Sequence, residues 1–308
     1  MADLSTSLAG VKLNNPLVLA SGVRGNNASL LIRAAKEGAG AVTSKSCSLL
    51  PREGHPNPTM YADPKSRYLL NAIGLSNPGV EAEAKEIEEA VAKAGVPVIA
   101  SVFAASADDF ANVAARIAKA KPAMIELDIS CPNVQREGEM FSSTKEAAAG
   151  VTKAVKQKLR ASAMPIPVSV KLSANVPDIG AIAQECQKAG ADCINAINTM
   201  PAMWIDVRAK RAVLANTYGG MSGPALLPIA LRAVHTIRKS CPNIPIIGGG
   251  GVSSGEDAAR MLMAGATAVS VGSAVYSRRN ALGEIKDELR TFMQEENFRQ
   301  ISEICLEG

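Results

Sequence analysis

The chain has 308 residues, of which 47% are hydrophobic and only 3% aromatic, a balance typical of parallel strands covered by helices rich in small residues. Lysines and arginines number 33 against 29 acidic residues, giving a net charge of +4 that is spread along the chain. With no concentrated basic patch, nucleic-acid binding is not expected, and we predict a small-molecule partner.

The beginning of the chain lacks the basic and apolar regions of a signal peptide, and no apolar run approaches the roughly 18 residues of a membrane span. We therefore expect a cytoplasmic protein. Six cysteines are scattered without a C-x-x-C pair, which argues against a zinc or iron–sulfur site held by this chain alone. Because His55 and His235 are the only histidines, neither a metal site nor a serine–histidine–acid triad is expected.

Eight short β-rich runs alternate with helical segments. They lie near Leu17–Ala20, Ala41–Ser44, Val98–Val102, Met124–Ile129, Pro167–Leu172, Cys193–Ile197, Ile244–Gly248 and Ala268–Val271. This alternation predicts a single α/β domain over residues 1–308, a (β/α)8 TIM barrel with its active site at the C-terminal face of the strands.

Between the strands, apolar residues recur at helical spacing, as in the row Val80, Ala84, Ile87, Val91 and Ala94, which predicts a helix packed on the barrel. Two segments, 46–72 and 131–145, are long and are predicted as loops. Loops of that length in a compact fold are usually functional.

Lysines end two predicted strands, Lys45 after the second and Lys171 within the fifth. A buried ammonium needs an anionic partner, so two lysines at the carboxyl ends of one barrel favour an anion site. The alternative for each is a lysine that reaches solvent at the rim. The loop from Asn71 to Gly79 supplies amides and glycines suited to a flat polar ring, although alone it also fits an ordinary turn.

The stretch from Ile125 to Asn133 carries the clearest catalytic signal, because an apolar strand ends in a cysteine that Pro132 prevents from continuing as strand. Cys131 would emerge at a carboxyl strand end, where barrels keep their chemistry, with Asp128 and Asn133 beside it. Its thiolate is the available general base. The alternative is a small buried cysteine at a strand end.

Glycines gather late in the chain, at Gly248–Gly251 after the seventh strand and at Gly272 after the eighth. Backbone N–H groups can approach a phosphate where no side chain intervenes, and a helix beginning near Ser253–Gly255 would add its dipole. The segment 219–223 is a third glycine-rich element compatible with a phosphoryl group. The alternative is tight turns without a ligand.

Taken in order, these motifs resemble the soluble, cysteine-base class of dihydroorotate dehydrogenases, which are FMN-containing barrels. The matching segments are Ala20-Ser21-Gly22, Thr43-Ser44-Lys45-Ser46, Asn71 to Gly79, Ser130-Cys131-Pro132-Asn133, Val170-Lys171-Leu172, Ile197-Asn198-Thr199, Gly220 to Pro224, Gly248 to Gly251 and Val271-Gly272-Ser273. The resemblance implies oxidation of dihydroorotate to orotate in pyrimidine biosynthesis. Cys131 would remove the proton from C5, and a hydride would pass from C6 to N5 of FMN.

The resemblance also implies two sets of site residues. The substrate set is Lys45, Asn71, Gly74, Leu75, Asp128, Asn133, Asn198 and Thr199. The cofactor set is Ala20, Ser21, Gly22, Lys45, Ser46, Asp128, Lys171, Ile197, Gly223, Gly250, Gly251, Gly272 and Ser273. The loop from residue 131 to 143 would close over the substrate and exclude water.

Within the family, the chain is most similar to the catalytic subunit that pairs with a separate FAD and iron–sulfur electron-transfer subunit, with NAD as the distant acceptor. A homodimer or a heterotetramer would follow. The membrane-associated class is less similar, because it has serine where this chain has Cys131. An N-terminal anchoring extension, typical of that class, is also not expected.

Two residues depart from the family pattern: Asp128 and Ser101 stand where asparagines are usual. An ionised aspartate only accepts hydrogen bonds and adds negative charge beside an anionic substrate. Two alternatives therefore stay open. One is a flavin barrel acting on another reduced pyrimidine or related ring, and the other is a non-redox barrel that binds a phosphate ligand.

Overall fold

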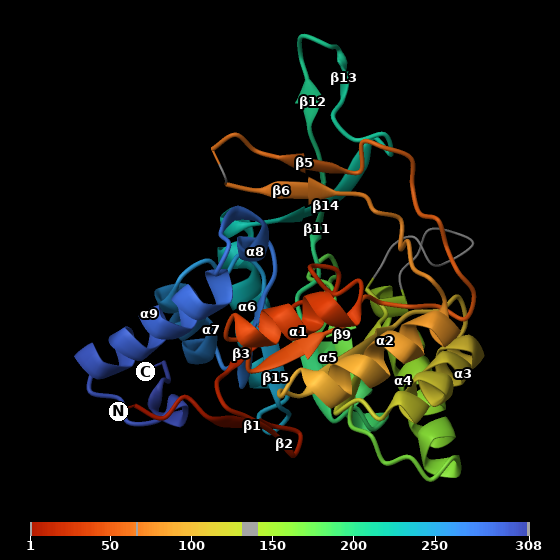
Figure 1. Cartoon of the computed structure of the whole chain (residues 1–308), viewed down its shortest axis with the longest axis horizontal. Helices are drawn as coiled ribbons and strands as arrows, with labels where there is room; N and C mark the ends of the chain where they lie inside the picture. The colour runs from red at the N-terminus through yellow and green to blue at the C-terminus, as the bar shows by residue number, and fades with distance from the viewer. Residues whose placement is uncertain (1, 66, 131–140, 307–308) are drawn as a thin grey trace.

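The computed structural model describes residues 2–65, 67–130 and 141–306 and shows a closed barrel of parallel strands with helices around it (Figure 1). In order around the barrel the strands are β3 (Leu17–Leu19), β4 (Ala41–Thr43), β7 (Val98–Val102), β8 (Met124–Asp128), β9 (Val168–Leu172), β10 (Cys193–Ala196), β15 (Ile246–Gly249) and β16 (Ala268–Val271). The predicted (β/α)8 barrel is confirmed, and each strand falls within two residues of its predicted bounds.

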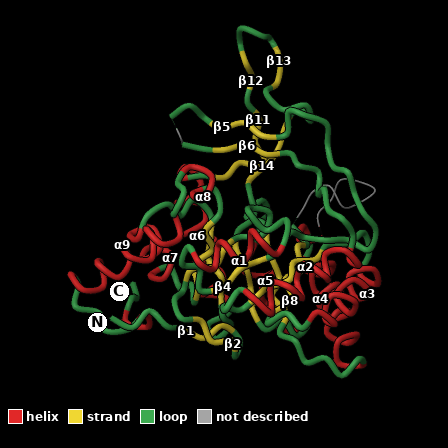
Figure 2. Tube along the Cα trace, viewed as in Figure 1, coloured by secondary structure: helices red, strands yellow, loops and turns green. Residues whose placement is uncertain are grey.

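Helices follow the barrel strands along the chain and pack around them; Figure 2 draws the helices in red and the strands in yellow. They are α1 (Ala28–Lys36), α2 (Val80–Lys93), α3 (Ala107–Ile117), α4 (Lys145–Ala161), α5 (Ile179–Lys188), α6 (Leu227–Ser240), α7 (Gly255–Met263), α8 (Ala274–Ser277) and α9 (Ala281–Glu295). Several begin at a side-chain cap, such as Ser106 on α3 and Thr144 on α4, which satisfies an otherwise unpaired N–H. Among the described residues, no helix combines the length and apolar character needed to cross a membrane.

The predicted apolar row on α2 is only partly right. Val80 and Ile87 are buried as expected, but Val91 is exposed, and Ala90 together with Glu83 completes the buried face. The buried row continues from Ile87 by a step of three residues instead of four, which places Ala90 against the barrel. A carboxyl group therefore lies buried where the sequence pattern indicated apolar packing.

The barrel interior is divided into two layers. An apolar lower layer includes Val18, Ile99, Met124, Cys193 and Ile247, and is closed by leucines of the hairpin β1 (Thr6–Leu8) and β2 (Val11–Leu13). Side chains alternate along a strand, so the residues two positions later face the same interior. On β7, β8, β10 and β16 those residues are polar: they are Ser101, Glu126, Asn195 and Ser270.

A small antiparallel sheet, here the cap sheet, stands over the mouth of the barrel (Figure 1). Its strands are β11 (Met200–Met203), β14 (Tyr218–Ser222), β6 (Leu69–Asn71) and β5 (Met60–Ala62), and a hairpin of β12 (Ile205–Asp206) and β13 (Arg211–Ala212) projects beyond it. The expectation of one long loop over residues 46–72 was therefore wrong. Strand β6 pairs with β14, about 150 residues away, and such pairing leaves no local sequence signal.

Candidate active site

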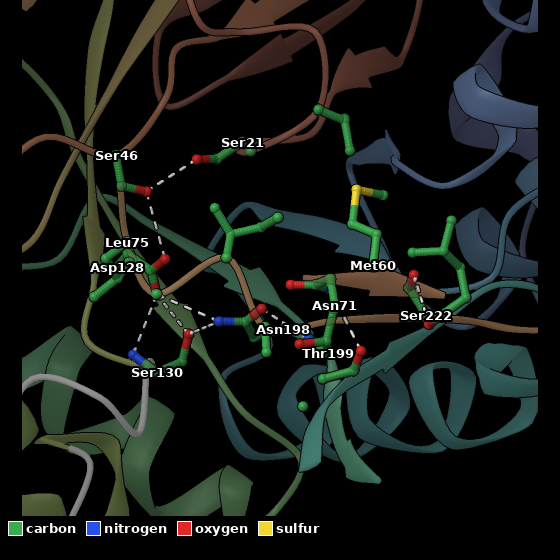
Figure 3. Close-up of a pocket in the computed structure, with 18 of the residues that line it drawn as sticks. Ser21, Ser46, Met60, Asn71, Leu75, Asp128, Ser130, Asn198, Thr199 and Ser222 are labelled. Atoms are coloured by element: carbon green, nitrogen blue, oxygen red, sulfur yellow. Dashed lines mark hydrogen bonds between the residues drawn. The ribbon is translucent and has the colours of Figure 1, made fainter. Parts of the chain in front are cut away.

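A cavity of about 500 Å³ lies between the carboxyl ends of the barrel strands and the cap sheet (Figure 3). Many predicted site residues line it. They are Ser21, Gly22, Lys45, Ser46, Asn71, Gly74, Leu75, Asp128, Lys171, Asn198, Thr199 and Ser273. The structure thus brings together residues from segments that are far apart in the chain.

Asp128, at the end of β8, is the main hydrogen-bond acceptor of the cavity wall (Figure 3). Its Oδ1 accepts from the Ser130 hydroxyl at 2.8 Å, from the Ser130 backbone N–H at 3.3 Å and from Asn198 Nδ2 at 3.4 Å. Asn198 Nδ2 also donates to Ser130 Oγ at 2.7 Å, and Asn198 Oδ1 accepts from the Thr199 N–H at 2.7 Å. These bonds fix the Asn198 amide, so its orientation depends on an acceptor at position 128.

A row of hydroxyl groups runs from the cavity into the barrel. Ser21 Oγ lies 3.0 Å from Ser46 Oγ, which lies 2.9 Å from Ser101 Oγ. The Ser101 hydroxyl donates to Glu126 Oε1 at 2.9 Å, and Asn195 Nδ2 donates to Glu126 Oε2. Ser101 thus bonds a carboxylate at the position where asparagine is usual.

Glu126 is fully buried, and its role was missed from the sequence. The signal was present, because Glu126 and Asp128 are two residues apart on one strand and so must share a face. Lys171 on β9 lies opposite Asp128 in the strand register. Its Nζ is 4.0 Å from Glu126 Oε1 and 3.9 Å from Asp128 Oδ2.

The cap sheet packs closely on two predicted substrate residues. A Cβ on Gly220 would lie 2.0 Å from Thr199 Oγ1, and one on Gly219 would lie 2.3 Å from the Asn71 carbonyl oxygen. Asn71 Nδ2 donates to the Gly220 carbonyl at 3.3 Å. Glycine at positions 219 and 220 is therefore required by packing against these residues, without any phosphoryl ligand.

The remaining predicted cofactor residues lie beside the cavity in two groups. In one group a Cβ on Gly250 would lie 3.3 Å from Ile197 Cγ1, and a Cβ on Gly251 would lie 2.8 Å from the Gly223 carbonyl oxygen. These three glycines have positive φ angles, so the backbone itself favours glycine there.

The second group is formed by Gly272 and Ala20. A Cβ on Gly272 would meet only Ala20 Cβ, at 3.6 Å, and its φ is not in the left-handed region. Packing therefore does not explain glycine at this position, whereas a closely approaching ligand would. This open backbone fits a bound phosphate group beside Ser273.

The amino terminus of α7 is not available to a phosphate. The Gly255 N–H donates to Glu288 Oε2 at 2.6 Å, and Ser254 caps the Asp257 N–H. Ser253 donates through both its N–H and its hydroxyl to Asp257 Oδ2. Side-chain oxygens of the chain itself accept from these donors, so the structure does not support the expected contribution of this helix to phosphate binding.

Near Ser44 and Lys45, at the end of β4, lies another buried carboxyl, that of Glu83 on α2. Burial, and then the neighbouring Glu86, raise the pKa of Glu83 to about 7, although Ser44 and Lys45 act in the opposite direction. Burial, with a contribution from Glu83, also raises the pKa of the Cys47 thiol. Cys47 is therefore an unreactive core thiol.

Cys131 and Asn133 lie outside the described residues. Ser130, which precedes Cys131 in the sequence, lines the cavity. Within the described ranges, no group of three or more histidine, cysteine, aspartate or glutamate residues is arranged to hold a metal ion.

A family model described as dihydroorotate dehydrogenase matches residues 3–293, which is nearly the whole chain. The chain belongs to the dihydroorotate dehydrogenase family. Membership implies an oxidoreductase with a flavin cofactor, and the open backbone at Gly272 together with the polar cavity fits such a group.

Relatives within the dihydroorotate dehydrogenase family align over almost their full length. The proteins from Methanosarcina mazei (42% identical, covering 98% of this chain and 94% of the relative), Thermoplasma acidophilum (40%, 99% and 98%) and Pyrococcus abyssi (41%, 98% and 97%) are similar. Each is named dihydroorotate dehydrogenase B (NAD(+)), catalytic subunit.

Proposed function

We propose that this chain oxidises dihydroorotate to orotate with FMN as its cofactor, in pyrimidine biosynthesis. The observation that carries the proposal is the cavity, in which Lys45, Asn71, Lys171 and Asn198 meet from four separate segments of a dihydroorotate dehydrogenase fold. Ammonium and amide groups are the donors that a carboxylate and a pyrimidine ring require.

The substrate would be held by side chains on opposite walls of the cavity. Lys45 supplies positive charge toward the substrate carboxylate, while Asn71 and Asn198 offer amides to the ring. The fixed orientation of Asn198 lowers the entropy that must be lost on binding. The other residues of this set are Gly74, Leu75, Asp128, Thr199 and, outside the described residues, Asn133.

The cofactor would extend from the cavity toward the glycines of β15 and β16. FMN, when bound, supplies an acceptor for the hydride of the substrate. Lys171 would stabilise negative charge on it, and Gly272 with Ser273 would receive its phosphate. The proposed cofactor set also includes Ala20, Ser21, Gly22, Lys45, Ser46, Asp128, Ile197, Gly223, Gly250 and Gly251.

Cys131 would remove the substrate proton. It follows Ser130 directly in sequence, and Ser130 lies in the cavity wall. Asp128 and Asn198 fix Ser130, so the chain enters the segment that contains Cys131 from a defined point. A thiolate is a competent base when its pKa suits the working pH.

An anaerobic absorbance spectrum, recorded before and after dihydroorotate is added, tests cofactor and substrate together. We expect a yellow protein that bleaches. A yellow protein that dihydroorotate leaves unbleached would instead support an oxidoreductase for another reduced pyrimidine. The negative charge of Asp128 in the cavity favours this alternative, because it repels an anionic substrate. A protein that cannot bind flavin would support the non-redox alternative, against which membership of an enzyme family argues.

The base assignment has its own test in Cys131→Ala. This variant should retain FMN but reduce flavin bleaching by dihydroorotate about 10²–10⁴-fold, the range for loss of a general base. Cys305→Ala, which changes an exposed cysteine far along the chain, serves as the control. An unchanged bleaching rate in Cys131→Ala would reject Cys131 as the base.

The names of the relatives, each called a catalytic subunit, support a partner subunit for this chain. We propose that an FAD and iron–sulfur subunit passes electrons from this chain to NAD, in a heterotetramer or around a homodimer of this chain. The isolated chain should then reduce an artificial dye with dihydroorotate but leave NAD unreduced. Direct NAD reduction by the isolated chain would remove the need for this partner.

A further inference from the structure

The barrel interior places two carboxylates beside one ammonium. Glu126 and Asp128 face inward from β8, and the Lys171 Nζ lies 4.0 Å from the first and 3.9 Å from the second. Lys171 is largely buried, with 11% of its side chain exposed. Charges at this separation interact strongly where water is limited, so both carboxylates reduce the positive potential that Lys171 presents to the cavity.

The two carboxylates differ in what holds them. Glu126 is enclosed in the barrel and bonded by Ser101 and Asn195. Asp128 lines the cavity, and its Oδ1 takes the hydrogen bonds of Ser130 and Asn198. Its Oδ2 faces the Ser46 hydroxyl at 3.5 Å and the Lys171 ammonium. Oδ1 of Asp128 therefore holds Ser130 and Asn198 in place, and Oδ2 interacts electrostatically with the Lys171 ammonium.

We propose that Asp128 lowers the reduction potential of the bound flavin by partly neutralising Lys171. This inference rests on the proposed function, in which Lys171 stabilises the negative charge of the reduced cofactor. A neutral side chain at position 128 would remove one of the two carboxylates that lie within 4.0 Å of the Lys171 ammonium among the described residues. The reduced flavin would then be stabilised more strongly relative to the oxidised flavin.

Asp128→Asn tests the inference with little change of shape. Asparagine keeps an oxygen for Ser130 and Asn198, and its amide nitrogen can donate to Ser46 Oγ. The readout is the midpoint potential of the bound flavin, titrated anaerobically against a reference dye. We expect the ratio of reduced to oxidised flavin at a fixed potential to rise roughly tenfold, which for a two-electron couple is an upward shift of about 30 mV.

Two comparisons make the result specific. Asp287→Asn on α9 removes an exposed negative charge remote from the cavity and should leave the potential unchanged. In a Lys171→Gln background, Asp128→Asn should shift the potential less, because the proposed effect acts through Lys171. If Asp128→Asn folds poorly, Asp128→Ser removes the same charge with a shorter side chain.

The outcomes separate the two proposals. Wild-type protein that binds no flavin would overturn the proposed function and, with it, this inference. A flavoprotein whose potential is unchanged or lowered by Asp128→Asn would overturn the inference alone. An equal shift with and without Lys171 would show that Asp128 does not act through that lysine.

Discussion

At the mouth of the barrel, strands β8 and β9 present the charged side chains of Asp128 and Lys171, whereas the loops after β15 and β16 present glycines. The first side, here the side-chain half, is held by hydrogen bonds and ion pairs that depend on functional groups. The second, here the glycine half, is held by close backbone approach. A substitution in the side-chain half should therefore change charge and hydrogen bonding, whereas a substitution in the glycine half should change the space available to a ligand or to neighbouring backbone.

The two halves match two parts of the proposed cofactor, its redox-active ring and its phosphate. A ring that changes charge during the reaction needs side chains that respond to charge, and β8 and β9 provide them. A phosphate needs backbone N–H groups and room, which only glycine gives without obstruction. The same barrel thus divides recognition between side chains and backbone.

Among substitutions that compare the two halves, the largest effect is expected from Lys171→Gln in the side-chain half. Removing a group that stabilises developing charge should slow flavin reduction by dihydroorotate about 10²–10³-fold, measured by stopped-flow absorbance. Lys156→Gln, which alters an ion pair with Asp192 outside the cavity, is the control. A rate within twofold of wild type would show that Lys171 is not needed for charge stabilisation.

Glu83→Gln should produce a pH-dependent gain in stability. Burial raises the Glu83 pKa from 4.5 to about 7, so the folded state holds a proton that the unfolded state releases between these pH values. Stability therefore falls as pH rises from 4.5 to 7, by about 3 kcal/mol in total. The free energy of unfolding from urea titrations should be similar for both proteins at pH 4.5 and higher for the variant at pH 8.

The control for that prediction is Glu88→Gln, because Glu88 lies on the exposed face of the same helix. It should show no such pH-dependent difference from wild type. If Glu83→Gln is no more stable than wild type at pH 8, ionisation of the Glu83 carboxyl does not destabilise the folded protein.

Gly251→Ala tests the glycine half. Its added Cβ would lie 2.6 Å from the Leu227 nitrogen and 2.8 Å from the Gly223 carbonyl oxygen, and its φ of +85° disfavours alanine. We expect a loss of roughly 2 kcal/mol in stability even without flavin, within the range for backbone strain. Thermal unfolding of the flavin-free protein measures this loss, and an unchanged transition would contradict the packing observed here.

The sequence predicted the barrel well because its strands are short apolar runs separated by helices, and each run can be found locally. The cap sheet could not be found in this way, because β6 pairs with β14 across the chain, β6 has only three residues, and β14 contains two adjacent glycines. Gly219 and Gly220 suggested a phosphate-binding loop, because the sequence alone does not show that they lie in a strand. Only the fold shows that Asn71 and Thr199 lie against them.

The sequence predicted many of the residues that line the cavity, but not the hydrogen bonds that hold them in place. Strand ends identified Lys45, Asp128 and Lys171, which share one cavity. The bonds that hold Glu126 depend on which residues of neighbouring strands share a layer, and this requires the strand register. Glu83 was hidden for a related reason, since a glutamate among apolar residues on α2 gives no sign of burial.

The smallest effect is expected from Gly272→Ala, and it distinguishes packing from ligand binding in the glycine half. The added Cβ would meet only Ala20 Cβ at 3.6 Å, so the flavin-free protein should be as stable as wild type. Gly150→Ala on α4, where a Cβ meets nothing, corrects for the general effect of replacing glycine. If a phosphate approaches Gly272, the methyl group will obstruct it, and fluorescence titration should show FMN binding weakened roughly tenfold, about 1.4 kcal/mol. Unchanged affinity would place the phosphate elsewhere and leave glycine at this position without a ligand-based reason.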